Sequence, residues 1–115
     1  MLMKKKKKLC EEIIMIILKV DRRILKDLNC SKIALMYGID RSYLSRIFKE
    51  SQGLYLREVI KRLKLLRCAF IMVERRDLTV TEIADIFGFD REDSFINSFK
   101  KLFGITPGKF KKWAR

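Results

Sequence analysis

Arg46 has the most clearly defined hydrogen-bonding chemistry in the sequence. It lies in a run with helical spacing of apolar residues, and Ser42 and Ser45 share its polar side. A guanidinium fork can donate two parallel hydrogen bonds, and the edge of a guanine base accepts such a pair. Serine hydroxyls can donate to or accept from either kind of base edge. These three side chains are candidates for base contacts; for Arg46 the alternatives are a phosphate contact or an ion pair with Glu50.

Such side chains need a helix that stands out from the fold, and the sequence predicts one. We expect a helix over residues 30–37, a tight turn at Gly38 and a second helix over residues 41–51. Ala34 is small enough for two helix backbones to approach, and glycine supplies the positive φ that ends a helix. This is a helix-turn-helix pattern, whose second helix can lie in a major groove of DNA.

The same pattern occurs a second time, 50 residues later. Residues 83–91 match residues 33–41, with Gly88 at the turn and Asp90 predicted to cap the following helix, over residues 91–102. Past the turn the offset becomes 51, which we attribute to one residue inserted at the start of that helix. A repeat that preserves alanine, glycine and apolar positions together indicates two copies of one unit.

The repeat carries the base-contact positions to Asp93, Ile96 and Asn97. Asparagine can form two hydrogen bonds with adenine. Glu92 and Asp93 would repel phosphates, so we interpret them chiefly as N-terminal charges that the helix dipole favours; contacts with cytosine amino groups are the alternative. We therefore expect weaker base recognition by the second copy. The candidates for phosphate contacts are the basic side chains around the two helices: Arg41, Lys49, Arg91, Lys100 and Lys101.

The doubled motif resembles the DNA-binding domain of the AraC/XylS family of bacterial transcription regulators. The resemblance covers about residues 12–113 and rests on LSRIFKESQG in the first copy and GFDREDSFINSFKKLFGITPGKF in the second. It implies an all-α fold in which a long spacer helix joins two helix-turn-helix subdomains. It also implies a sequence-specific regulator of double-stranded DNA, with activation favoured and RNA polymerase as a second partner. The family's contact positions fall on Ser42, Ser45 and Arg46.

Two positions depart from the family's pattern. Asn97 stands where arginine is common, and Leu65 stands where members often carry arginine, four residues before Ala69. The first departure weakens the expected base recognition by the second copy. The second leaves open how the two units are oriented.

We expect about seven helices in four parts: a basic tail over residues 1–10, a first helix-turn-helix subdomain over 11–54, a spacer helix over 55–74 and a second subdomain over 75–115. A helix of twenty residues spans about 30 Å, close to the roughly 34 Å between successive major-groove faces. The spacer could therefore hold two recognition helices in adjacent major grooves. Its predicted apolar positions are Leu56, Val59, Ile60, Leu63, Leu66, Phe70 and Val73.

Both ends of the chain carry specific expectations. The first helix is predicted over residues 11–26, with Ile13, Ile17 and Ile24 among its packing positions. The last helix should begin at Thr106 and Pro107 and fold back through Phe110 and Trp113. The basic side chains of this last segment should stay in solvent: Lys109, Lys111, Lys112 and Arg115.

The charge balance favours a polyanionic partner. The formal net charge is +13, and removing the five lysines at residues 4–8 still leaves +8. Nucleic acid is the expected partner, and the alternative is a non-specific module for anionic surfaces, including membranes. The lysine run is interpreted as a solvated, mobile tail, or as an arm that adds phosphate contacts. The apolar run at residues 13–18 is too short to span a bilayer.

The residues that build enzyme and metal sites are scarce in this sequence. It has three cysteines, no histidine and no glycine-rich phosphate loop, so we expect no enzyme activity, no metal and no cofactor. Cys30 and Cys68 are interpreted as small core residues of a reduced protein in the cytoplasm, associated with the nucleoid. The sequence has no room for the separate ligand-sensing domain usual in the family. We expect a stand-alone monomeric regulator, or an isolated fragment of a longer one.

Overall fold

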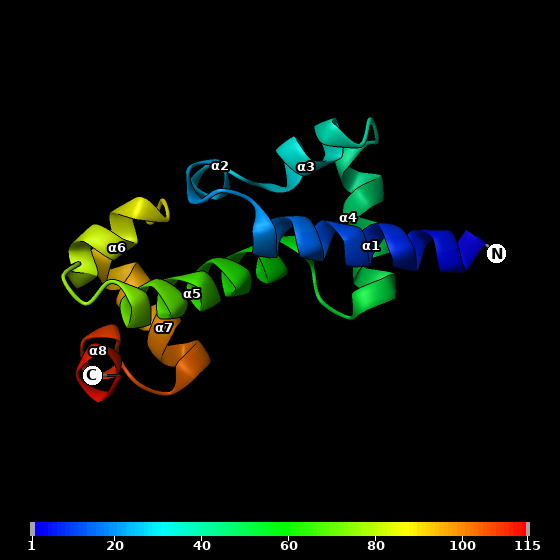
Figure 1. The fold of residues 1–115 in the computed structure, drawn as a ribbon. Coiled ribbons are helices and arrows are strands. Elements are labelled where there is room, and N and C mark those ends of the chain that lie inside the picture. Colours follow the sequence, from blue (N-terminus) through cyan, green and yellow to red (C-terminus); the bar gives the residue numbers. More distant parts are fainter. Residues whose placement is uncertain (1, 115) are drawn as a thin grey trace. The chain divides into compact units, whose positions relative to one another are not determined.

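The computed structural model describes residues 2–114, and all the regular structure in this range is α-helical (Figure 1). The predicted fold class, all-α with two helix-turn-helix units, is confirmed. The helices are α1 (Leu2–Lys19), α2 (Arg22–Lys26), α3 (Cys30–Met36), α4 (Arg41–Gln52), α5 (Leu56–Glu74), α6 (Val80–Ile86), α7 (Glu92–Phe103) and α8 (Pro107–Trp113). The chain divides into two compact units, Met1–Leu63 and Lys64–Arg115, called unit 1 and unit 2 below.

The N-terminal segment differs from its prediction, because the lysine run belongs to a helix rather than to a tail. Helix α1 begins at Leu2 and continues through the lysines, which favour helix almost as well as leucine does. The predicted single helix over 11–26 is also wrong, because Asp21 caps a new helix by accepting a hydrogen bond from the Arg23 backbone N–H at 2.8 Å. The break gives eight described helices instead of seven and leaves Ile24 57% exposed.

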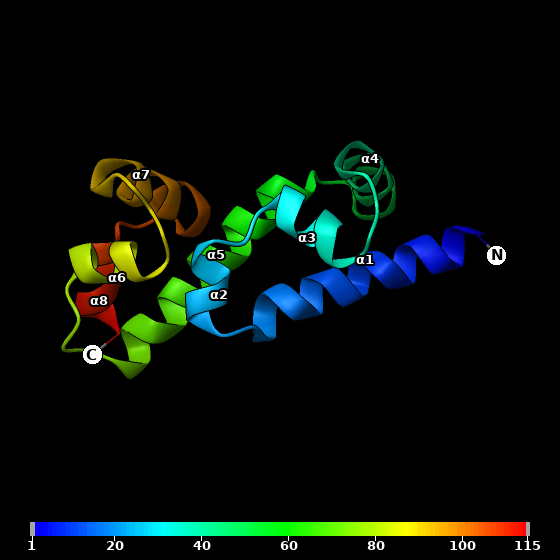
Figure 2. The same cartoon turned by 90° about the horizontal axis from the view of Figure 1, so that it is seen from above.

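Unit 1 has a largely aliphatic core built around α4, with Phe48 as its buried aromatic ring. Helices α1 and α3 both pack against α4, and Figure 2 shows α4 nearly end-on beside α1. This confirms the expectation that the first helix packs on the first helix-turn-helix. The fully buried positions include Cys10, Ile13, Ile17, Ile33, Leu44, Ile47 and Phe48. Helix α4 is therefore held from two sides.

The two helix-turn-helix turns have the same backbone hydrogen bonds. After α3, the N–H of Ile39 donates to the carbonyl of Ala34 at 3.0 Å; after α6, the N–H of Phe89 donates to the carbonyl of Ala84 at 2.9 Å. This pattern is the Schellman motif, which requires a residue with positive φ between the two partners. Gly38 (φ 64°) and Gly88 (φ 77°) occupy that position. The turns at residues 38 and 88 are thus alike in geometry as well as in sequence.

Unit 2 is held together by aromatic rings that pack against one another in tilted and edge-on arrangements. Phe95 and Phe99 are fully buried, and their ring centroids lie 6.0 Å apart. Phe99 also meets Phe103 at 4.6 Å and, from α8, Phe110 at 5.7 Å. Phe110 therefore folds α8 back onto α7, as predicted. The prediction for Trp113 is wrong: its side chain is 77% exposed and only touches Phe110, with centroids 6.0 Å apart.

Helix α5 was predicted correctly in extent but only partly in its buried face. Leu56 and Ile60 are buried as expected, whereas Phe70 is 61% exposed. Val73 is also exposed. The first half of α5 belongs to unit 1 and the second half to unit 2, so one helix must bury two different faces. The other buried positions, all in the second half, are Leu65, Cys68, Ala69, Ile71 and Met72.

Candidate nucleic-acid interface

The N-terminus of α4 is fixed by a side-chain cap. The Asp40 carboxylate accepts a hydrogen bond from the Tyr43 backbone N–H at 3.2 Å, and α4 follows at Arg41. Leu44, Ile47 and Phe48 point into the core. Because these three positions face inward, the opposite side of α4 is presented to solvent.

The candidate base-contact residues of unit 1 lie together on this outward side of α4. Ser42 and Arg46 are exposed, and Ser45 is half-buried. The Arg46 guanidinium carbon lies 5.5 Å from the centroid of the Tyr43 ring, one helical turn away. Within residues 2–114 no ion pair joins Arg46 to Glu50, so the guanidinium donors are turned to the aromatic ring and to solvent.

The corresponding helix of unit 2 starts differently, and the prediction for Asp90 is wrong. The N-cap of α7 is Arg91, and it makes no side-chain capping hydrogen bond. Helices α3 and α6 keep an offset of 50 residues, whereas α4 and α7 are offset by 51. The inserted residue is thus accommodated in the turn, ahead of the helix. It moves Asp90 one residue too far from the first turn of α7 to cap it.

Arg91 and Asp93 are paired with each other at this helix start. Arg91 donates two hydrogen bonds to the Asp93 carboxylate, at 2.9 and 3.2 Å, and Asp93 Oδ1 also accepts from the Ser94 backbone N–H at 2.9 Å. Glu92 and Asp93 both lie in the first turn of α7, where the helix dipole favours negative charge. Of the candidate base contacts in this copy, Asn97 is exposed and Ile96 is half-buried.

The phosphate candidates are all exposed, but they differ in their present contacts. Lys49 donates from Nζ to the Gly53 carbonyl at 2.8 Å and lies 4.9 Å from the centroid of the Tyr55 ring. Lys100 and Lys101 occupy the same last turn in α7, and Arg41 begins α4. Each unit therefore gathers its candidates on a single helix and the turn before it.

Two residues near these candidates did not stand out in the sequence. Tyr43 is 36% exposed in the first turn of α4, and its ring is approached by Arg46 and, from α1, by the Lys6 ammonium at 5.8 Å. The spacing from Tyr43 to Arg46, three residues on a helix, was a signal for the first contact. The contact with Lys6 had no local signal, because it joins two helices.

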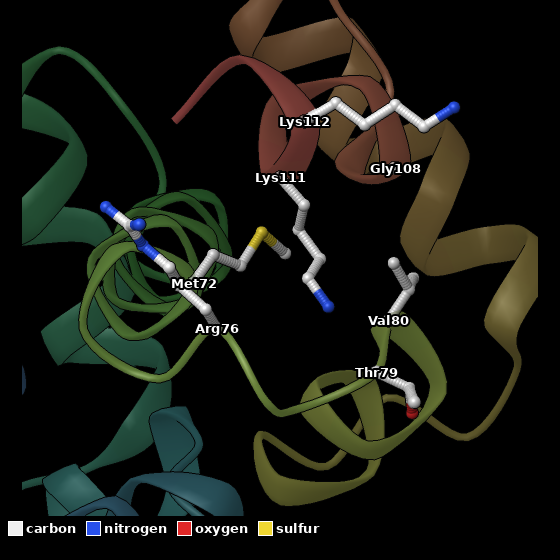
Figure 3. Close-up of a pocket in the computed structure, with 7 residues that line it drawn as sticks. All are labelled: Met72, Arg76, Thr79, Val80, Gly108, Lys111 and Lys112. Carbon is white, nitrogen blue, oxygen red and sulfur yellow. The ribbon is translucent and has the colours of Figure 1, made fainter. Parts of the chain in front are cut away.

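Unit 2 also contains a pocket of about 340 Å³ between the end of α5, the start of α6 and α8 (Figure 3). The Lys111 side chain extends into it, between Met72 and Val80, and its Nζ donates to the Leu78 backbone carbonyl. Lys111 is therefore half-buried and bonded to the protein rather than extended into solvent, contrary to prediction, and Arg115 lies outside the described residues. Because the Lys111 ammonium donates to the Leu78 carbonyl, this hydrogen bond attaches α8 to the loop before α6.

The shifted pKa values away from the candidate interface belong to an ion pair in a loop and to buried core residues. Two hydrogen bonds from Arg75, at 2.8 and 3.0 Å, lower the pKa of Asp77 to about 2 in the loop between α5 and α6. Burial raises the pKa of the Cys30 and Cys68 thiols, which keeps them as neutral core groups. Their interpretation as small core residues is confirmed by exposures of 8% and 0%. None of the described helices has the length and apolar character needed to cross a membrane.

Comparison with known proteins defines the class of this fold and surface. Residues 22–112 match the family described as "Helix-turn-helix domain". The C-terminal domain of AraT, a response regulator from Geobacillus stearothermophilus, has the same fold: it aligns with a TM-score of 0.76 at 23% identity, over 91% of this chain and 84% of that one. The chain belongs to this helix-turn-helix family, in its AraC/XylS form, whose members are DNA-binding transcription regulators.

Particular relatives are regulators by name. The chain is 36% identical over 80 residues to the probable transcription factor PqrA of Proteus vulgaris, covering 70% of this chain and 65% of PqrA. It is 33% identical over 86 residues to the F1 operon positive regulatory protein of Yersinia pestis, covering 75% of this chain and 28% of that protein. The chain thus spans less than two thirds of the length of these relatives.

Proposed function

We propose that this chain is a sequence-specific transcription regulator that binds double-stranded DNA with α4 and α7 as its two recognition helices. The observation that carries the proposal is the outward face of α4, where Ser42, Ser45 and Arg46 stand beyond a capped helix start and a buried inner face. Base contacts from this face supply specificity, and the basic surface supplies affinity that does not depend on sequence.

The two helices enter adjacent major grooves of one duplex. Helix α5 has 19 residues, which span roughly 28 Å, and major-groove faces on one side of DNA repeat about every 34 Å. One copy of the chain then covers an asymmetric site, so it acts as a monomer on the nucleoid, in the cytoplasm. The phosphate contacts come from Arg41, Lys49, Arg91, Lys100 and Lys101.

Base recognition is unequal between the helices. In unit 1 the Arg46 donors are available to a guanine edge. In unit 2 the Asp93 carboxylate is held by Arg91 and by the helix start, which leaves Asn97 as the side chain best suited to contact a base. We assign most of the sequence preference to the half-site under α4.

The mode of action is activation through contact with RNA polymerase. The supporting observation is the relationship to a protein named as a positive regulator. Binding, and not catalysis, is the proposed role of the chain, since its relatives are named as regulators.

Selection of bound sequences from a random duplex pool tests this function. We expect an asymmetric motif with two half-elements about one helical turn apart, richer in information in one half. Binding without enrichment, equally sensitive to salt on every duplex, would contradict sequence-specific recognition and leave a non-specific module for anionic surfaces.

A further inference from the structure

The lysine-rich half of α1 is the strongest charged feature that the two recognition helices do not explain. Five consecutive lysines, residues 4–8, occupy the first two turns of α1, and four of them are exposed. No acidic side chain lies in the first turn. Positive charge is unfavourable at the positive end of a helix dipole, and like charges four residues apart, such as Lys4 and Lys8, repel each other. An anion bound here would relieve both effects.

Packing fixes these lysines beside the recognition helix of unit 1. The buried stripe of α1 runs through Cys10, Ile13 and Ile17, and Lys6 continues it at helical spacing toward the N-terminus. Lys6 is half-buried, and its ammonium lies 5.8 Å from the centroid of the Tyr43 ring in α4. The same ring is approached by Arg46 at 5.5 Å. The Tyr43 ring thus lies in contact with both the lysine run and Arg46, the best candidate for base contact.

The lysines lie along one flank of α4. Lys4, Lys6 and Lys7 line a hollow of about 260 Å³ together with three residues of α4, namely Ile47, Glu50 and Ser51. At 100° per residue, Tyr43 and Glu50 lie beside the face that carries Ser42 and Arg46, and Ile47 and Ser51 lie further round toward the core. A helix in a major groove about 12 Å wide has a phosphate backbone along each side. A cationic flank therefore faces phosphates.

We propose that the lysine-rich half of α1 is a third DNA-contacting element, which binds the phosphate backbone next to the half-site occupied by α4. This inference rests on the proposed function. The lysines add affinity without sequence preference, and they also offset the negative charge of Glu50 where the flank meets the backbone. The effect on binding is an additional dependence on salt, because each phosphate contact releases condensed counterions.

Two variants of equal charge test the proposal. The first replaces the exposed lysines Lys4, Lys5, Lys7 and Lys8 with Gln and keeps Lys6 for packing; the second replaces four exposed lysines elsewhere, Lys19, Lys61, Lys109 and Lys112. Glutamine favours helix about as well as lysine does, and far-UV circular dichroism verifies that both variants fold. Binding of the selected duplex is titrated at several salt concentrations.

The α1 variant should reduce the slope of log K against log salt by about 2, at roughly 0.9 per lost phosphate contact, and the control by less than 1. The ratio of the binding constant of the unmodified chain to that of the α1 variant should then fall about 16-fold between 50 and 200 mM salt. Hydroxyl-radical footprinting should show lost protection only beside the α4 half-site. Equal slopes for the two variants, or an unchanged footprint, would overturn the proposal.

The ratio of affinities for selected and scrambled duplexes separates this inference from the proposed function. The α1 variant should leave that ratio unchanged, because phosphates carry no sequence information. If the unmodified chain binds the selected and scrambled duplexes with nearly equal affinity, the proposed sequence-specific function is wrong, independently of the result for the lysines. If the α1 variant loses only its binding to phosphatidylserine vesicles and keeps its DNA affinity and slope, the lysines serve a membrane surface and the proposal is wrong.

Discussion

Units 1 and 2 share one helix-turn-helix plan but differ in how the second helix begins and in how the core is filled. Both turns are Schellman motifs with glycine at positive φ, and α4 and α7 each have 12 residues. Asp40 caps α4, whereas α7 has no side-chain cap and begins with Glu92 and Asp93. The one-residue insertion thus goes with the difference between a capped helix start in unit 1 and an uncapped, acidic helix start in unit 2.

This difference has consequences for recognition. In α4 the capping carboxylate of Asp40 accepts a hydrogen bond from the backbone, and the outward face carries Ser42, Ser45 and Arg46. In α7 two acidic side chains stand in the first turn, and one of them, Asp93, lies on the same outward side as Asn97, one helical turn away. The proposed function therefore assigns stronger base contacts to α4 than to α7. The predictions below test this comparison.

The largest effect is expected from the core. Phe48 and Phe99 are equivalent and fully buried, so Phe48→Ala and Phe99→Ala should each lower the free energy of unfolding of their unit by about 3–5 kcal/mol. The loss for Phe99→Ala should be about 0.5–1.5 kcal/mol larger, because the Phe99 ring contacts three other rings in tilted or edge-on arrangements. Amide hydrogen exchange in α4 and α7 measures each unit separately. Equal losses would contradict the aromatic contribution.

The turns should respond alike. Gly88→Val forces a β-branched residue to a φ of 77°, and Gly38→Val does the same at 64°. Each substitution should destabilise its own unit by about 1–3 kcal/mol and leave exchange in the other helix-turn-helix unchanged. Thermal unfolding followed by circular dichroism gives the total loss. An unchanged melting temperature for Gly88→Val would refute the turn geometry.

The helix caps should respond differently. Asp40→Ala removes the hydrogen bond to the Tyr43 N–H and should cost about 1 kcal/mol. Asp90→Ala should stay within about 0.5 kcal/mol of the unmodified chain, because Asp90 is exposed and does not cap α7. Urea denaturation of both variants measures the difference. Equal losses of stability for Asp40→Ala and Asp90→Ala would indicate that Asp90 caps α7, as the sequence pattern predicted.

The sequence predicted the architecture well because its strongest signals are local. Glycine at each turn, alanine before it and apolar residues at helical spacing predict α3, α4 and α7 to within about one residue. The capping box of Thr79 and Glu82 likewise marks the start of α6. These features act between residues close in the chain, so their spacing is visible without a structure.

The errors arose where competing local arrangements differ little in energy. An insertion next to Asp90 can be absorbed by the turn or by the helix, and the repeat alone does not distinguish them. The leucine-rich α5 offers more than one apolar face, and tertiary packing selects among them. The lysine run forms helix because α1 continues into a buried stripe, which a charge run by itself does not reveal.

The candidate interface was predictable as a set of positions, but not as a set of contacts. Ser42, Ser45 and Arg46 lie on the expected face of α4. The pairing of Arg91 with Asp93 and the approach of Lys6 to Tyr43 depend on side-chain placement after the insertion and across two helices. Such contacts have no spacing rule in the sequence.

The most direct test of the central claim compares Arg46→Ala with Asn97→Ala on the selected duplex and on a scrambled one. We predict that Arg46→Ala loses about 1–3 kcal/mol of binding free energy on the selected duplex and much less on the scrambled one, and that Asn97→Ala loses less than Arg46→Ala. Equal weakening of both duplexes by Arg46→Ala would make Arg46 a phosphate contact. A larger loss for Asn97→Ala would contradict the proposed dominance of unit 1.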